Sequence, residues 1–109
     1  MRCFVKLYAR SIITVALFIP MLAACLTSSA NLQEGIASFR SQKYRAAFIR
    51  LRPEARKGQP DAQYAIGYMF YYGQGVVEDR KQAWYWITAA ANQGQPDARV
   101  AVNILFKKR

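Results

Sequence analysis

The stretch GQPDA runs from Gly58 to Ala62 and occurs again from Gly94 to Ala98, 36 residues later. One long unit, AQYAIGYMFYYGQGVVEDRKQAWYWITAAANQG, joins the two copies, and alanines and phenylalanines around it repeat with the same offset. A fixed period of this size is typical of stacked helix pairs and not of an enzyme pocket. The repeat therefore favours an interaction module, and it leaves open what the module binds.

Composition and charge narrow the classes of function. The chain has 109 residues, of which 53% are hydrophobic, and this content argues against disorder. It contains no histidine, so it lacks the usual general base and the usual metal ligand. The formal net charge of +10 indicates either solubility near an anionic surface or binding to nucleic acid. Because no nucleic-acid motif accompanies this charge, we do not expect nucleic acid as a partner.

The acidic residues offer little material for catalysis. Asp79 is a candidate helix cap, and Asp61 and Asp97 are repeat equivalents at helix starts, where a carboxylate is favourable. A paired-carboxylate site is therefore not expected. We predict a non-enzymatic protein with no cofactor and no metal. The full set of acids is Glu34, Glu54, Asp61, Glu78, Asp79 and Asp97.

The first 24 residues have the pattern of a secretory signal peptide. The segment MRCFVKLYAR carries three positive charges and no acid, and an apolar run then extends from Ser11 to Ala24. This run is too short for a permanent transmembrane helix, which needs about 20 residues. We therefore assign residues 1–24 to a signal peptide and exclude them from the fold.

Leu22-Ala23-Ala24-Cys25 resembles the lipobox of bacterial lipoproteins. The resemblance implies that the Cys25 thiol receives a diacylglycerol, that cleavage falls just before it, and that its new amine is acylated, as with palmitate. Residues 25–31 then form a short periplasmic tether. Leu26 is not the aspartate that tends to retain enteric lipoproteins at the inner membrane, which favours the outer membrane. The alternative is an ordinary signal peptide cut after Ala30, which gives a secreted protein.

Hydrophobic periodicity predicts about five helices over residues 32–109 and no strand. Asn31 is a candidate N-cap for the first helix, and Asp79 with Gln82 resembles a capping box that opens the fourth. In each copy of GQPDA the glycine ends one helix and the proline begins the next. The second helix carries cations that form either a solvated face or a contact with anionic lipid headgroups or polymer. These are Lys43, Arg45, Arg50, Arg52, Arg56 and Lys57.

The last three helices share one spacing of apolar residues, which predicts their buried faces. Gly67 in the third helix is destabilising by about 1 kcal/mol relative to alanine, and we expect the close approach of a neighbouring helix to compensate. Gly73 and Gly75 are expected to turn the chain with positive φ. The predicted faces are Ala62, Ala65, Ile66, Met69 and Phe70; Ala83, Trp86, Ile87, Ala90 and Ala91; and Ala98, Ala101, Val102, Leu105 and Phe106.

These residues resemble the pattern of the Sel-one-like repeats, which are relatives of the tetratricopeptide repeats. The resemblance implies a short antiparallel α/α solenoid of about five helices with a scaffold or adaptor role and without catalysis. Within it, residues 32–57 are a divergent helix pair, residues 58–93 a full repeat, and residues 94–109 a half repeat. The matching positions are Ala62, Gly67, Met69, Gly73, Gly75, Val76, Asp79, Ala83, Trp86, Ala90, Ala91, Gly94 and Ala98.

Aromatic residues beside the core positions are the candidates for partner binding. In related repeat folds the first helix of each pair lines the concave surface, and rigid aromatics with a polar tip suit recognition. For Tyr64 we favour packing between helices, and packing remains the alternative for the others. The candidates are Tyr68, Tyr71, Tyr72, Trp84 and Tyr85.

The leading hypothesis is a membrane-anchored adaptor that recruits a protein partner in the bacterial envelope. The alternatives are binding of an envelope polymer such as peptidoglycan and a secreted factor that interacts with a host. Val100 and Ile104 are apolar although they lie off the core face of the fifth helix, where a terminal helix should be polar. We therefore expect this end to dock on a partner or on a second copy of the chain.

Overall fold

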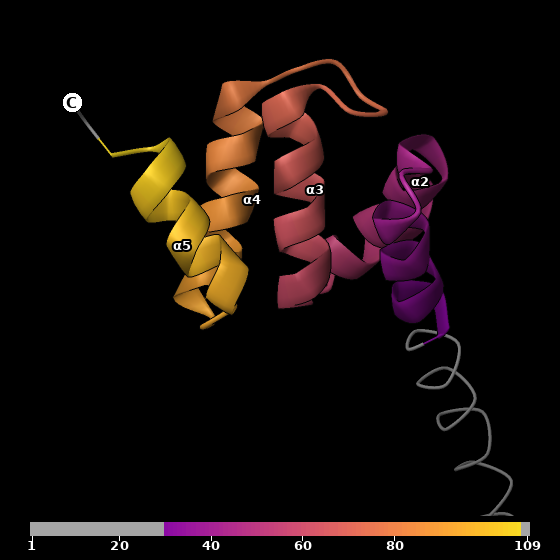
Figure 1. Ribbon diagram of the computed structural model, residues 1–109. Coiled ribbons are helices and arrows are strands. Elements are labelled where there is room, and N and C mark those ends of the chain that lie inside the picture. The colour runs from indigo at the N-terminus through magenta and orange to yellow at the C-terminus, as the bar shows by residue number, and fades with distance from the viewer. Residues whose placement is uncertain (1–29, 108–109) are drawn as a thin grey trace, which may run out of the picture. The chain divides into compact units, whose positions relative to one another are not determined.

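The computed structural model describes residues 30–107, and these residues form five helices and no strand. Residues 30–40 are helical, and they are followed by α2 (Tyr44–Arg56), α3 (Pro60–Tyr72), α4 (Arg80–Asn92) and α5 (Pro96–Leu105), as Figure 1 shows. The prediction of an all-α fold of about five helices is confirmed. The predicted signal peptide, Cys25 and the predicted tether up to residue 29 lie outside the described residues.

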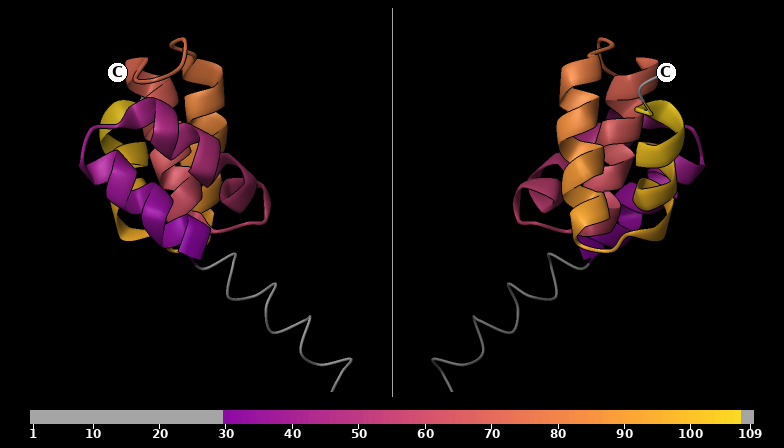
Figure 2. Two further views of the ribbon diagram at one scale, coloured as in Figure 1. Left: turned by 90° about the vertical axis from the view of Figure 1, so that its right-hand side faces the viewer. Right: turned by 90° about the vertical axis from the view of Figure 1, so that its left-hand side faces the viewer.

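Consecutive helices pack side by side as a short α/α solenoid. α3 packs against both α2 and α4, and α4 in turn packs against α5. In the two side views of Figure 2, α5 lies toward one side of the helix stack and α4 toward the other. α3 is therefore the central helix, and its opposite sides are covered by different neighbours.

The repeated GQPDA positions the helix boundaries as predicted. Pro60 and Pro96 are the first residues of α3 and α5, where a missing N–H and a fixed φ are favourable. Gly58 and Gly94 have φ of +98° and +88°, which other residues rarely adopt. Each copy thus ends one helix, turns the chain and begins the next helix within a few residues.

Two expectations about helix N-termini are wrong. Ala30 and Asn31 already lie in the first helix, so Asn31 does not cap it, and the last two residues assigned to the tether are helical. Asp79 caps α4 by accepting hydrogen bonds from the backbone N–H groups of Lys81 and Gln82, at 3.0 and 3.1 Å. The return half of a capping box is not formed, because the Asp79 N–H donates to the carbonyl of Phe70 at 2.9 Å.

The core consists of two clusters built largely from alanine. The first joins α2 and α3 around Leu51, Ile66 and Met69, and the second joins α4 and α5 around Ile87. Trp86, predicted to be in the core, is only partly buried and packs against the first cluster from α4. Small side chains allow the helix axes to approach closely, and the few large ones fill the space between them. The buried alanines are Ala47, Ala55, Ala62, Ala65, Ala83, Ala90, Ala98 and Ala101.

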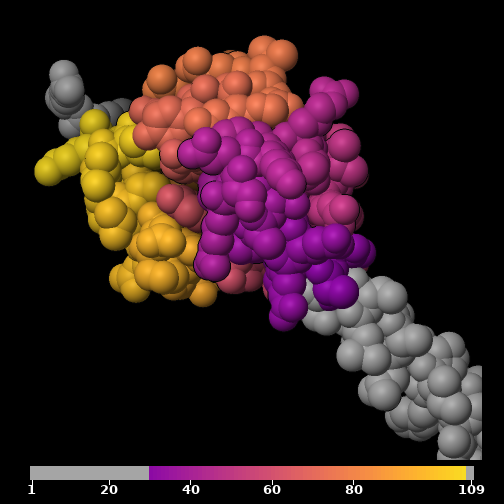
Figure 3. All heavy atoms as spheres, turned by 45° about the vertical axis from the view of Figure 1, so that its right-hand side comes forward, coloured from indigo at the N-terminus to yellow at the C-terminus, as the bar shows by residue number. Residues whose placement is uncertain are grey.

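The loop between α3 and α4 lies against the beginning of α2. Gly75, with φ of +73°, lies so close to the beginning of α2 that an added Cβ would be 2.8 Å from the Arg45 backbone nitrogen. Space-filling atoms of this loop adjoin those of the first two helices in Figure 3. The expected positive φ at Gly73 and Gly75 is confirmed, and at Gly75 the close approach is a second reason for glycine.

Candidate partner-binding surface

Eight aromatic side chains form a continuous series of ring contacts across the described helices. We call this set the aromatic surface. α3 contributes four tyrosines to it, and the other helices contribute the residues on either side. Its members are Phe39, Tyr44, Tyr64, Tyr68, Tyr71, Tyr72, Trp84 and Phe106.

The first half of the aromatic surface joins the helix over residues 30–40 to α3. The ring of Phe39 lies edge-on to Tyr68, with centroids 5.4 Å apart, and Tyr68 contacts Tyr72 at 4.7 Å. The edge-to-face pair of Phe39 and Tyr68 is favoured by the quadrupoles of the rings, and such a pair is worth about 0.5–1.5 kcal/mol beyond its buried area. These contacts hold the tyrosine rings in place before any partner arrives.

The second half joins α3 to α4 and to the end of α5. Phe106 contacts Tyr71 at 5.7 Å and Trp84 at 4.9 Å between centroids. The guanidinium of Arg80 lies 3.9 Å from the centroid of the Tyr71 ring, and its Nε donates to Glu78 at 2.9 Å. Arg80, which is ion-paired with Glu78, therefore adds a guanidinium group at the edge of the aromatic surface.

Exposure differs along the aromatic surface. Tyr72 and Trp84 are 49% and 46% exposed, whereas Tyr64, Tyr68 and Tyr71 are partly buried. Burial raises the pKa of the Tyr64 phenol above its usual 10.0, and the nearby Asp97 carboxylate adds to this shift. Burial likewise raises the pKa of Tyr68. The exposed rings can contact a partner directly, and the half-buried ones support them.

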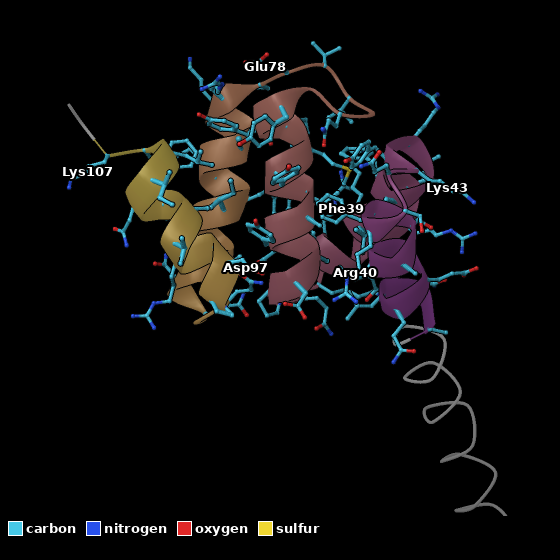
Figure 4. The ribbon with its side chains drawn as sticks, viewed as in Figure 1. Phe39, Arg40, Lys43, Glu78, Asp97 and Lys107 are labelled. Atoms are coloured by element: carbon cyan, nitrogen blue, oxygen red, sulfur yellow. The ribbon has the colours of Figure 1, made fainter. Side chains whose placement is uncertain are left out.

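A small polar hollow adjoins the aromatic surface beside Tyr64. Its volume is about 170 Å³, and its lining includes Phe39, Arg40, Asp61 and Asp97. Figure 4 shows Arg40 on the first helix and Asp97 on α5, on either side of α3. The hollow thus offers both charges within reach of one ligand group.

The two copies of GQPDA contact each other at this hollow. The Gln95 side-chain amide donates to Asp61 at 3.4 Å, and its carbonyl accepts from the backbone N–H of Ala98 at 2.5 Å. Gln63 makes a second set of hydrogen bonds, since it donates to the Ala55 carbonyl at 3.1 Å and accepts from Gln93 at 2.7 Å. The sequence gives no sign of the Gln95–Asp61 and Gln93–Gln63 bonds, because each joins residues about one repeat apart.

The structure brings together four of the five predicted site residues. Tyr68, Tyr71, Tyr72 and Trp84 belong to the aromatic surface. Tyr85 does not: it is 61% exposed, and its ring contacts Trp86, 5.0 Å away. The favoured packing role of Tyr64 agrees with its contacts to the cluster formed by α4 and α5.

Phe39, Tyr44 and Phe106 belong to the aromatic surface although the sequence did not identify them as binding candidates. Phe106 was predicted to lie on the buried face of the fifth helix. The helical spacing of Phe39 and Tyr44 indicates the side of the helix that they occupy, and it does not indicate which ring they meet. Phe106 lies just after α5, so the repeat offset from Phe70 does not predict its contacts.

The chemistry of the aromatic surface suits binding. It offers ring faces, phenol hydroxyls and one guanidinium, which can stack on and hydrogen-bond to a ligand. Within residues 30–107, no group of three or more metal-ligating side chains could hold a metal ion. In the same part of the chain, no helix is long and apolar enough to cross a membrane.

The fold is that of a short α/α repeat protein. Residues 60–95, from the start of α3 to the residue before α5, match the family described as Sel1 repeat, so the chain contains a Sel1-like repeat. Proteins built from Sel1 repeats generally mediate protein–protein interaction. No curated protein and no solved structure shows significant similarity to the chain.

Proposed function

We propose that this chain is a non-catalytic adaptor, held at the bacterial envelope by a lipid on Cys25, that binds a protein partner through the aromatic surface. The observation that carries the proposal is the continuous series of ring contacts, with Tyr72 and Trp84 exposed beside Arg80. Aromatic and arginine side chains dominate the binding energy of many protein interfaces. Rings already fixed by their neighbours lose little conformational entropy when a partner binds.

Crosslinking in intact cells followed by mass spectrometry tests the protein partner. We expect the unaltered chain to capture a defined protein, and Tyr72→Ala with Trp84→Ala to lose it. Tyr85→Ala is the matched control, because Tyr85 is an exposed aromatic residue outside the aromatic surface. Circular dichroism should show equal helicity in all variants. Unchanged capture by the Tyr72→Ala/Trp84→Ala variant would remove the aromatic surface from the proposal.

The anchor rests on the lipobox resemblance at Leu22-Ala23-Ala24-Cys25. More than one acyl chain is needed for stable anchoring, because a single chain gives marginal, reversible binding. Metabolic labelling with a fatty-acid analogue should mark the unaltered chain and should not mark Cys25→Ala. Absence of label on the unaltered chain would refute the anchor and would favour a secreted protein.

Binding of peptidoglycan is the second candidate, and the exposed rings of Tyr72 and Trp84 beside Arg80 favour it. Such rings can stack on sugar rings as well as on protein side chains. Pull-downs before and after muramidase digestion separate the two candidates. A captured protein that persists after digestion supports the adaptor, and one that disappears supports the polymer.

A further inference from the structure

A second hollow lies away from the aromatic surface, between α2 and α4. Its volume is about 460 Å³, and α3 forms part of its lining because both of these helices pack against it. Trp84 belongs to the aromatic surface and Trp86 lines this hollow. Residues i and i+2 of a helix point in directions about 200° apart, so α4 presents Trp84 and Trp86 to opposite sides. The residues that we use below are Phe48, Arg52, Arg56, Phe70, Gln82 and Trp86.

This hollow combines an aromatic lining with positive charge. Phe48, Phe70 and Trp86 are partly buried and form its apolar part, and Phe48 and Phe70 meet edge-on at 5.6 Å. Arg52 and Arg56 are exposed and lie four residues apart on α2, so they project from the same side of the helix. Among residues 30–107, no acidic residue lines the hollow.

The two arginines differ from other cations of α2. Arg50 forms an ion pair with Glu34, and Lys57 forms one with the buried Glu54. Among residues 30–107, no carboxylate lies within ion-pair distance of Arg52 or Arg56, and the Arg52 guanidinium lies 5.9 Å from the Phe48 ring centroid. Their guanidinium groups are therefore available to an external carboxylate.

We propose that this hollow binds an acidic peptide segment of a partner protein, with an aromatic side chain inserted between α2 and α4 and flanking carboxylates on Arg52 and Arg56. The guanidinium fork matches the geometry of a carboxylate. A flat lipid surface would meet exposed arginines, but it would not reach the partly buried rings of Phe70 and Trp86. The site is independent of the aromatic surface, and it would let the chain hold two ligands on different sides.

Fluorescence anisotropy on the detergent-solubilised full-length chain tests the proposal. The probe is a short fluorescent peptide in which glutamates flank one central phenylalanine. We expect saturable binding that Arg52→Gln/Arg56→Gln weakens at least about tenfold, a change that corresponds to about 1.4 kcal/mol. The matched control is Lys43→Gln/Arg45→Gln, which removes the same charge at the N-terminal end of α2, outside the hollow, and should change binding less than about twofold.

Two further peptides test the chemistry of the ligand. Replacing the glutamates by glutamine, or the phenylalanine by glycine, should each weaken binding, because one change removes the carboxylates and the other the inserted ring. Equal losses in the Arg52→Gln/Arg56→Gln and control variants would overturn the proposal, since binding would then follow net charge alone.

Lipid vesicles test the competing occupant. The unaltered chain is compared with the Arg52→Gln/Arg56→Gln variant for peptide binding and for preference for phosphatidylglycerol over phosphatidylcholine vesicles. The proposal is overturned if the variant keeps peptide binding but loses this vesicle preference. That outcome would assign the two arginines to lipid headgroups. Retained preference for phosphatidylglycerol together with lost peptide binding supports the peptide site.

Discussion

At Gly67, α3 packs tightly against α4. A Cβ added there would lie 2.5 Å from Cγ1 of Ile87 and 3.0 Å from its backbone nitrogen. Gly67→Ala therefore overpacks this contact, which costs about 1–3 kcal/mol, while the gain in helix propensity returns about 1 kcal/mol. We expect a net destabilisation of up to about 2 kcal/mol in urea unfolding followed by circular dichroism.

A double-mutant cycle with Ile87→Ala isolates that contact. Ile87→Ala alone is destabilising because it opens a cavity in the cluster of α4 and α5. In this background Gly67→Ala should cost less, because the contact with Cγ1 of Ile87 is gone while the contact with the backbone nitrogen remains. An equal cost of Gly67→Ala in both backgrounds would show that the Ile87 side chain is not the reason for glycine.

Tyr64 should make folding stability sensitive to alkaline pH. Its folded-state pKa is raised above 10.0 by burial, with a further contribution from Asp97. The folded state therefore holds the phenol proton of Tyr64 more tightly than the unfolded state does. The resulting contribution to the free energy of unfolding is complete below pH 10.0 and is lost as pH rises through the folded-state pKa. Tyr64→Phe cannot ionise, and its urea-unfolding free energy should fall less steeply above that pH.

Tyr85→Phe is the control for that titration, because Tyr85 is largely exposed. It should follow the alkaline decline of the unaltered chain. If Tyr64→Phe and Tyr85→Phe decline equally, the burial of Tyr64 does not contribute to the pH dependence.

At the scale of helices, the two copies of GQPDA have the same residues and different hydrogen bonds. Gln95 is buried, caps α5 through Ala98 and also contacts Asp61 of the first copy. Gln59, its equivalent, is exposed and makes no side-chain cap bond. Gln95→Ala should thus lower the free energy of unfolding by about 1–2 kcal/mol, because it leaves buried groups without partners.

Gln59→Ala gives the matched comparison within one chain. It should change the unfolding free energy by less than about 0.5 kcal/mol, as is usual for exposed positions. Chemical denaturation of the two variants measures the difference. Similar costs would mean that the motif acts only through its glycine and proline.

Helix boundaries were predictable where they depend on local backbone preferences. The proline at each helix start and the glycine at each turn act through their own φ, so Pro60, Pro96, Gly58 and Gly94 revealed four of the helix limits. The missing half of the capping box was not predictable. The Asp79 N–H has a competing acceptor at Phe70, and only the folded loop brings that carbonyl near.

The candidate surface was predictable only where it depends on local helical spacing. Helical spacing placed Tyr68, Tyr71 and Tyr72 outside the core of α3, but spacing alone cannot say which rings of other helices they meet. Trp84 and Tyr85 are neighbours in sequence, and only Trp84 contacts Phe106. The distinction depends on where the chain after α5 packs, which is a long-range property.

At the scale of the whole molecule, α5 has an apolar face that no other helix of residues 30–107 covers. Val100 and Ile104 are 56% and 71% exposed and one helical turn apart. Tyr64 and Tyr68, the equivalent positions one repeat earlier, are instead partly buried, and Phe39 covers Tyr68. We expect α5 of a second copy to cover this face, because burying apolar surface stabilises association.

Sedimentation velocity of the detergent-solubilised full-length chain tests self-association. The unaltered chain should form dimers as concentration rises, and Val100→Glu/Ile104→Glu should remain monomeric, because two glutamates would be desolvated opposite their own copies. Ile49→Glu/Val77→Glu places the same charges at exposed apolar positions of α2 and of the loop before α4, and it should dimerise normally. A monomeric unaltered chain at the highest concentration would contradict the dimer and leave the α5 face to a different protein, which the in-cell crosslinking experiment can identify by crosslinks to α5.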